Sequence, residues 1–108
     1  MAMGAVQSIT ATGASANLQT PTATETVLPY DDLILHVANA SGSAITVTLV
    51  DPGFTPAGSA ATNATVSIPA TTGRKFIAIS TGLMNSTTGL ISVQFSATTS
   101  VTAEWLVR

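Results

Sequence analysis

Short segments of this sequence alternate apolar and polar side chains with a period of two residues. The clearest is 45–49, Ile-Thr-Val-Thr-Leu, in which the aliphatic side chains point to one side and the threonines to the other. No long stretch repeats its apolar residues every three to four positions, which is the pattern of an amphipathic helix. The alternation therefore predicts an all-β chain.

Turn residues divide the alternating pattern into about seven short strands. We expect strands within 32–39, 45–49, 64–68, 74–80, 90–96 and 100–107, with a possible first strand within 5–11. Segment 32–39 is apolar on both faces, which predicts a central position in its sheet. The short polar loops predict that consecutive strands pair as hairpins, 32–39 with 45–49, 64–68 with 74–80, and 90–96 with 100–107. Residues 81–89 are expected to form a loop with one helical turn around 83–85.

The length of 108 residues fits one domain. Short strands with turns every 8–12 residues or so are typical of sandwiches and small barrels. We predict a single-domain antiparallel β-sandwich, jelly-roll-like or Greek-key, formed by residues 29–108. Residues 1–28 are predicted to be an extended N-terminal arm that reaches a neighbouring subunit, because an unpaired chain end frays unless it is tied down. Within this segment, 12–26 lacks periodicity and is expected to be an extended connection.

Only eight side chains are charged, and the chain has one histidine and no cysteine. Soluble domains carry about 25% charged residues, and most catalytic chemistry needs carboxylates, imidazoles, thiols or amines close together. We therefore predict a protein that is not an enzyme and has no cofactor or metal site. The net charge of −2 argues against a nucleic-acid partner. No apolar stretch approaches the roughly 18–20 residues of a membrane helix, and the first residues lack the pattern of a secretory signal, which predicts synthesis in a cytoplasm.

Hydroxyl groups replace charge as the source of surface polarity, since the chain contains nineteen Thr and eleven Ser. A hydroxyl or methyl group loses far less free energy on leaving water than an ionised Lys or Glu does. A surface of Thr, Ser and Ala therefore suits a protein that packs against neighbours. A net charge near zero also favours association, so we expect a homo-oligomer.

The titratable residues admit two interpretations each. His36 is a candidate catalytic base or pH switch, but we interpret it as a structural or surface histidine because no triad partner is spaced near it. Asp31, Asp32 and Asp51 have the oxygen ligands that calcium prefers, although acidic residues at strand ends are more often turn formers.

Asn39, Asn63 and Asn85 each begin an Asn-X-Ser/Thr triplet, a pattern that arises by chance in so Ser- and Thr-rich a chain.

Two further pairs of residues are candidate binding groups. Arg74 and Lys75 adjoin after a glycine and can either hold a phosphate or form half of a salt bridge to a neighbouring subunit. Tyr30 and Trp105 can form a platform that stacks on a sugar, whereas a single Trp in an alternating strand is more often a core residue.

Three segments carry a resemblance to a known group of proteins. They are HVANASGSAITVTLVDPG at 36–53, ATVSIPATTGRKFIAIS at 64–80 and GLISVQFSATTSVTAEWLVR at 89–108. Over about residues 29–108 the chain resembles small structural proteins encoded beside the major capsid gene of tailed bacteriophages. Similar proteins tend to have Asn-Asp-Gly where this chain has Tyr30-Asp31-Asp32. The resemblance implies a β-sandwich on the capsid exterior, often a trimer, that decorates the head and stabilises it.

Residues and resemblance together predict a structural virion protein. We expect a decoration protein on the exterior of a tailed-phage head that catalyses no reaction. Its expected partners are the major capsid protein and further copies of itself, with which it forms a trimer. The predicted protein-binding residues are Met3, Val6, Ile9, Leu18, Arg74, Lys75, Leu83 and Met84. The alternative is a receptor- or glycan-binding module of a phage tail or fibre, which would use Tyr30, Trp105, Asn63 and Asn85.

Overall fold

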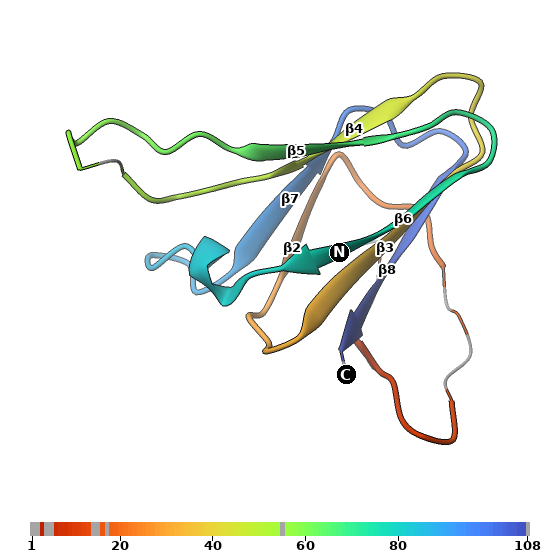
Figure 1. Cartoon of the computed structure of the whole chain (residues 1–108), viewed down its shortest axis with the longest axis horizontal. Helices are drawn as coiled ribbons and strands as arrows, with labels where there is room; N and C mark the ends of the chain where they lie inside the picture. Colours follow the sequence, from red (N-terminus) through yellow and green to blue (C-terminus); the bar gives the residue numbers. More distant parts are fainter. Residues whose placement is uncertain (1–2, 4–5, 14–15, 17, 55, 108) are drawn as a thin grey trace.

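The computed structural model describes residues 3, 6–13, 16, 18–54 and 56–107 (Figure 1). Within them it contains eight strands and one short 3-10 helix. The elements are β1 (Gln7–Ser8), β2 (Thr24–Val27), β3 (Leu33–Asn39), β4 (Ile45–Leu49), β5 (Ala64–Ile68), β6 (Gly73–Ile79), η1 (Thr81–Leu83), β7 (Ile91–Phe95) and β8 (Val101–Val107). The prediction of an all-β chain is confirmed, and the helical turn lies two residues earlier than expected.

The strands form two four-stranded sheets. Sheet A has the order β1-β8-β3-β6, and sheet B has the order β2-β7-β4-β5. This is the strand order of a jelly roll, so the predicted sandwich is confirmed. The strand that the sequence did not predict is β2, whose Thr24, Thr26 and Val27 are β-branched residues that suit a strand even in a segment without long periodicity.

The predicted hairpins were wrong. Strands β3 and β4 lie in different sheets, as do β5 and β6, and β7 and β8. Among the described strands, β4 and β5 are the only consecutive pair that hydrogen-bonds within one sheet. The alternation shows which side of a strand is buried but not which strand lies beside it, and a short loop can cross the roughly 10 Å between stacked sheets as readily as it can reverse the chain.

Strand β3 lies between β8 and β6, so its predicted central position is confirmed. The apolar residues of β3 and β4 that were expected to share a side do face one core, from opposite sheets. That core is aliphatic around a single tryptophan and includes Leu33, Leu35, Val37, Ile45, Val47, Ile68, Ile91, Val93, Val101 and Trp105.

The N-terminal segment runs along β8 and then returns. Strand β1 pairs with β8 in parallel, with Gln7 opposite Leu106. After the turn at residues 10–13, Gln19 forms an antiparallel bridge with Ala103 on the same strand. Within the predicted arm, residues 7–9 and Gln19 thus pair with β8 of sheet A, and β2 joins sheet B before the boundary that we placed at residue 28. The sandwich was predicted to be antiparallel, but the β1–β8 pair is parallel.

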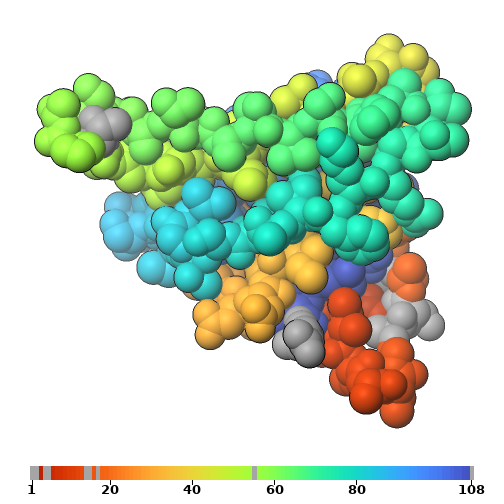
Figure 2. Space-filling model, viewed as in Figure 1, coloured from red at the N-terminus to blue at the C-terminus, as the bar shows by residue number. Residues whose placement is uncertain are grey.

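The connection between β4 and β5 projects from the sandwich as an arm whose described residues are 50–54 and 56–63, which we call the hairpin arm. Figures 1 and 2 show it extending to the upper left, beyond the body of the molecule. Phe54 bridges Ala60 across it, the Ala61 amide donates to the Gly53 carbonyl at 3.0 Å, and the Asp51 amide donates to Asn63 Oδ1 at 2.8 Å. These contacts give the arm a defined shape.

Candidate functional site

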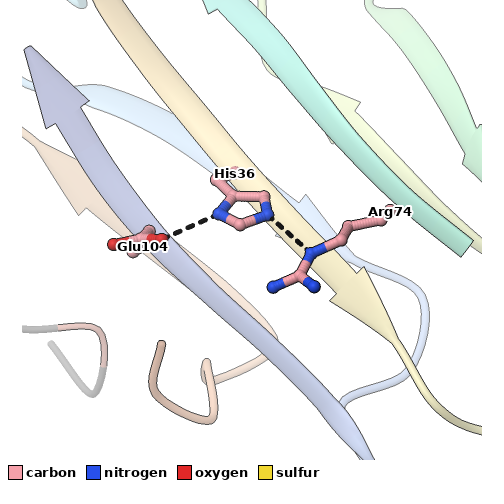
Figure 3. Close-up of polar contacts among 3 residues, drawn as sticks. All are labelled: His36, Arg74 and Glu104. Carbon is pink, nitrogen blue, oxygen red and sulfur yellow. Dashed lines mark hydrogen bonds and ion pairs between the residues drawn. The ribbon is translucent and has the colours of Figure 1, made fainter. Parts of the chain in front are cut away.

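Three strands of sheet A bring His36 into a polar cluster on the outer face of the sheet (Figure 3). The strand register places Glu104 of β8 and Phe76 of β6 directly opposite His36 of β3. His36 Nδ1 lies 2.7 Å from Glu104 Oε2, and Arg74 Nε donates to His36 Nε2 at 3.0 Å. The Phe76 ring stacks on the imidazole with a centroid distance of 4.2 Å and an interplanar angle of 12°. We call these four residues the His36 cluster.

The hydrogen bonds determine which nitrogen of His36 carries the proton. An arginine Nε always bears a hydrogen, so His36 Nε2 must accept from Arg74. Nδ1 then carries the proton and donates to the Glu104 carboxylate. The imidazole is therefore neutral in this arrangement, and both of its nitrogens are occupied, which leaves no free nitrogen to take a proton from a substrate.

The cluster is covered on one side by the N-terminal segment. His36 and Glu104 are buried, with 5% and 4% of their surface exposed. Beside them is a hollow of about 210 Å³ whose walls include Gln7, Ile9 and Leu106. The burial agrees with the interpretation of His36 as a structural residue.

Arg74 and Lys75 do not act as a pair. Consecutive strand residues point to opposite faces, so Arg74 lies with His36 on the outer face of sheet A while Lys75 stands on the other side of β6. Both side chains are exposed. The phosphate grip that would need both cations is not formed by this arrangement.

Among the described residues, the four strands of sheet B place no charged side chain on the outer face of that sheet. Every strand of the sheet contributes hydroxyl or amide side chains to it, which are Thr24, Thr26, Thr46, Thr48, Thr65, Ser67, Ser92 and Gln94. The register aligns Thr24, Gln94, Thr48 and Thr65 in one row across all four strands. We call this surface the hydroxyl face.

The hairpin arm adds exposed apolar surface at one end of the sandwich. Phe54 is 74% exposed, which is the largest exposure among the large hydrophobic side chains of the described residues. It shares an open hollow of about 490 Å³ with Met84, which is 40% exposed. Met84 was a predicted contact residue, whereas Phe54 was missed because it lies in a loop without periodicity.

The remaining predicted contact residues are distributed differently. Met3 is 1% exposed and belongs to the core, so its side chain offers no surface to a partner. Val6 and Leu83 are partly buried against the same core. Leu18 is half-buried, and Ile9 is 39% exposed.

The sugar-stacking platform is not formed. Trp105 is 1% exposed in the core, while Tyr30 is 38% exposed in the loop before β3. The amide oxygens of Asn63 and Asn85 accept hydrogen bonds from the backbones of Asp51 and Thr87, which gives them structural roles in loops.

The aspartates lie in turns. Asp51 Oδ1 accepts from the Gly53 amide at 2.9 Å, and Asp32 has a φ of 59°, in the left-handed region. Within the described residues, no group of three or more His, Cys, Asp or Glu side chains is arranged to hold a metal ion.

Asn39 has a role that the sequence analysis missed. Its side chain is buried at the end of β3. Nδ2 donates to the carbonyls of Ser43, Ile68 and Pro69 at 2.9, 3.3 and 3.1 Å. Oδ1 accepts from the amide and hydroxyl of Ser41. Asn39 therefore holds together the β3–β4 and β5–β6 connections, both of which cross between the sheets. In the sequence, the Ser-Gly-Ser loop that follows Asn39 was the available indication of this role.

Comparison of the chain with models of protein families, with curated proteins and with solved structures gave no match. The described chain contains no helix whose length and apolar character would let it span a membrane.

Proposed function

We propose that this protein is a decoration protein that binds the exterior of a tailed-phage head and stabilises contacts between neighbouring major capsid subunits. The observation that carries the proposal is the hydroxyl face, to which the four described strands of sheet B contribute hydroxyl and amide side chains and no charged ones. Burying such a face against another protein desolvates only hydroxyl and amide groups, which can hydrogen-bond to the partner or to trapped water. Charged side chains in the same place would oppose association far more strongly.

The hairpin arm supports the same role. The arm extends beyond the body of the sandwich (Figure 2). It contains the exposed Phe54, and an exposed aromatic side chain is the kind of residue that anchors an interface. An arm and a broad uncharged face together allow one subunit to touch two neighbours at once.

The resemblance of residues 29–108 to phage head proteins favours the major capsid protein as the partner. At the point where similar proteins tend to have glycine, Asp32 holds the backbone at a φ of 59°, so the turn that those proteins favour is compatible with this chain. We propose a homotrimer as the assembled form, with the protein located on the capsid exterior.

The role requires no catalysis, and the occupied nitrogens of His36 are consistent with a protein that is not an enzyme. The glycan-binding alternative loses support because Trp105, its main aromatic residue, is buried.

The test is co-sedimentation of the purified protein with empty capsids of the phage that encodes it. We expect the wild-type protein to pellet with capsids. Thr46→Lys places a charge on the hydroxyl face and is expected to weaken binding at least about tenfold, because the ammonium group must be desolvated. Thr20→Lys, at an exposed threonine outside this face, is the matched control. The proposal fails if the wild-type protein stays in the supernatant, or if both variants bind equally well.

A further inference from the structure

Loops at one end of the sandwich surround an open hollow of about 460 Å³ next to the His36 cluster. The Thr71 amide donates to the Ser41 carbonyl at 2.8 Å, and the Ala40 amide donates to the Ser100 carbonyl at 2.9 Å, so these loops are held together. The hollow is lined mainly by small and hydroxyl-bearing residues. Among the described residues that line it, Arg74 is the one that carries a charge.

Two lining residues have unusual backbone conformations. Thr71 has a φ of 69° and Ser100 a φ of 58°, in the left-handed region that non-glycine residues seldom adopt. Such residues persist only where their surroundings hold them, and they are frequent at binding sites.

Arg74 is oriented before any partner arrives. Its Nε is held by His36 Nε2, and His36 is held in turn by Glu104. In Figure 3 the terminal nitrogens Nη1 and Nη2 point away from His36. Within the described residues they have no hydrogen-bond acceptor and no ion-pair partner. The free end of the guanidinium therefore offers two parallel N–H donors, a geometry that matches a carboxylate.

The chain itself supplies the complementary charge at a different place. Glu25 and Glu104 are buried, and Asp51 caps its own turn. Asp31 and Asp32, which precede β3, are exposed acidic residues. Arg74 lies beside the other end of β3, opposite Ala38, so about six residues of strand, or roughly 20 Å, separate the two charges. They cannot meet within one chain.

We propose that Arg74 of one copy binds the Asp31-Asp32 pair of a second copy, in a head-to-tail contact at the end of the sandwich. Because the two surfaces are different, the contact is heterologous and a ring forms when the rotation between copies closes. His36 and Glu104 act as positioning residues, since they fix the guanidinium. This contact rests on the self-association that is part of the proposed function, and it specifies which residues form one of the contacts between copies. The contact does not require that the protein bind capsids.

Charge reversal with rescue tests the pairing, with sedimentation velocity as the readout. Arg74→Glu alone and Asp31→Arg alone are each expected to weaken self-association at least about tenfold. Asp31→Arg leaves the turn residue Asp32 in place. The double variant carries the reversed pair on every copy and is expected to restore association. A structural defect caused by Arg74→Glu would not be repaired by a change about 20 Å away in the same chain.

Lys75→Glu is the matched control, because it makes the same change of charge at the next residue on the opposite face. It is expected to associate like the wild type. Fluorescence of Trp105 confirms that each variant is folded. The proposal is overturned if the wild type is monomeric, if Lys75→Glu weakens association as much as Arg74→Glu, or if the double variant is no better than the single ones. Oligomers that form normally but ignore capsids would overturn the decoration role and leave this contact standing.

Discussion

Replacing Asn39 by alanine tests whether one buried amide holds the two sheet-crossing connections together. The variant loses the donors to the carbonyls of Ser43, Ile68 and Pro69 and the acceptor for Ser41. Ser43 and Pro69 are exposed, so water can reach their carbonyls, whereas Ile68 is fully buried.

The expected loss follows from this difference. The bond to the buried Ile68 carbonyl cannot be replaced by a bond to water, although that carbonyl keeps its pairing with Ile45 in the β4–β5 ladder. Each of the lost hydrogen bonds contributes about 0.5–1.5 kcal/mol. Since the contributions overlap, we expect Asn39→Ala to lower the free energy of unfolding by about 3 kcal/mol. That is a large part of the 5–15 kcal/mol or so that stabilises a typical domain.

Urea unfolding followed by the fluorescence of Trp105, the single tryptophan, measures this loss. Protein concentration must be equal in all samples, because self-association adds to apparent stability. Asn63→Ala is the control. It removes one exposed hydrogen bond, to the Asp51 amide, and is expected to cost less than about 1 kcal/mol.

Asn39→Asp separates the two halves of the amide. It keeps the acceptor for Ser41 but turns an oxygen toward the carbonyls of Ile68 and Pro69. It should therefore be at least as destabilising as Asn39→Ala. The reasoning is refuted if Asn39→Ala unfolds within about 1 kcal/mol of the wild type with an unchanged slope, or if Asn39→Asp is harmless.

Three further outcomes are expected. Gly73→Ala should destabilise the protein by more than about 2 kcal/mol in the same urea assay. The new Cβ would lie 1.9 Å from the Pro69 carbonyl oxygen, so the backbone must move. A smaller loss would show that the turn changes its conformation at little cost. At a protein concentration low enough for the monomer to dominate, Asp32→Gly should raise the unfolding midpoint slightly, by the equivalent of a few tenths to about 1 kcal/mol, since glycine adopts its positive φ without strain. A lower midpoint for the monomer would contradict this. Long-range ¹H–¹⁵N spectra at neutral pH should show His36 protonated at Nδ1 alone, and a proton on Nε2 would rule out the bond from Arg74.

The positions of core residues were predictable from the sequence, and the partners of the strands were not. The period of two identified the inward side of β3 and β4, and the apolar character of both sides of β3 indicated its central place. Hairpin pairing failed because polar loops such as 40–44 fit a reversal and a crossing between sheets equally well. What decides between them includes Asn39, whose contacts reach residues 29 and 30 positions away.

The contacts of the candidate site depend on distant residues. His36 could be recognised as a strand residue, but Arg74 and Glu104 are 38 and 68 positions away. Only the register of three strands shows that they meet. The adjacency of Arg74 and Lys75 suggested a joint site, although alternation along β6 sends them to opposite faces.

The position of β8 has a consequence for the timing of folding. Strand β8 comes last in sequence among the described strands, yet it lies inside sheet A, between β1 and β3. While a ribosome is still making this strand, β1 has no neighbour to pair with, and β3 lacks one of its two. Sheet A must therefore close after the strands of sheet B have been synthesised, by long-range pairing of the kind that folds slowly. A prematurely terminated chain would expose the apolar side of β3, which makes it a target for chaperones and proteases rather than a subunit that joins an assembly.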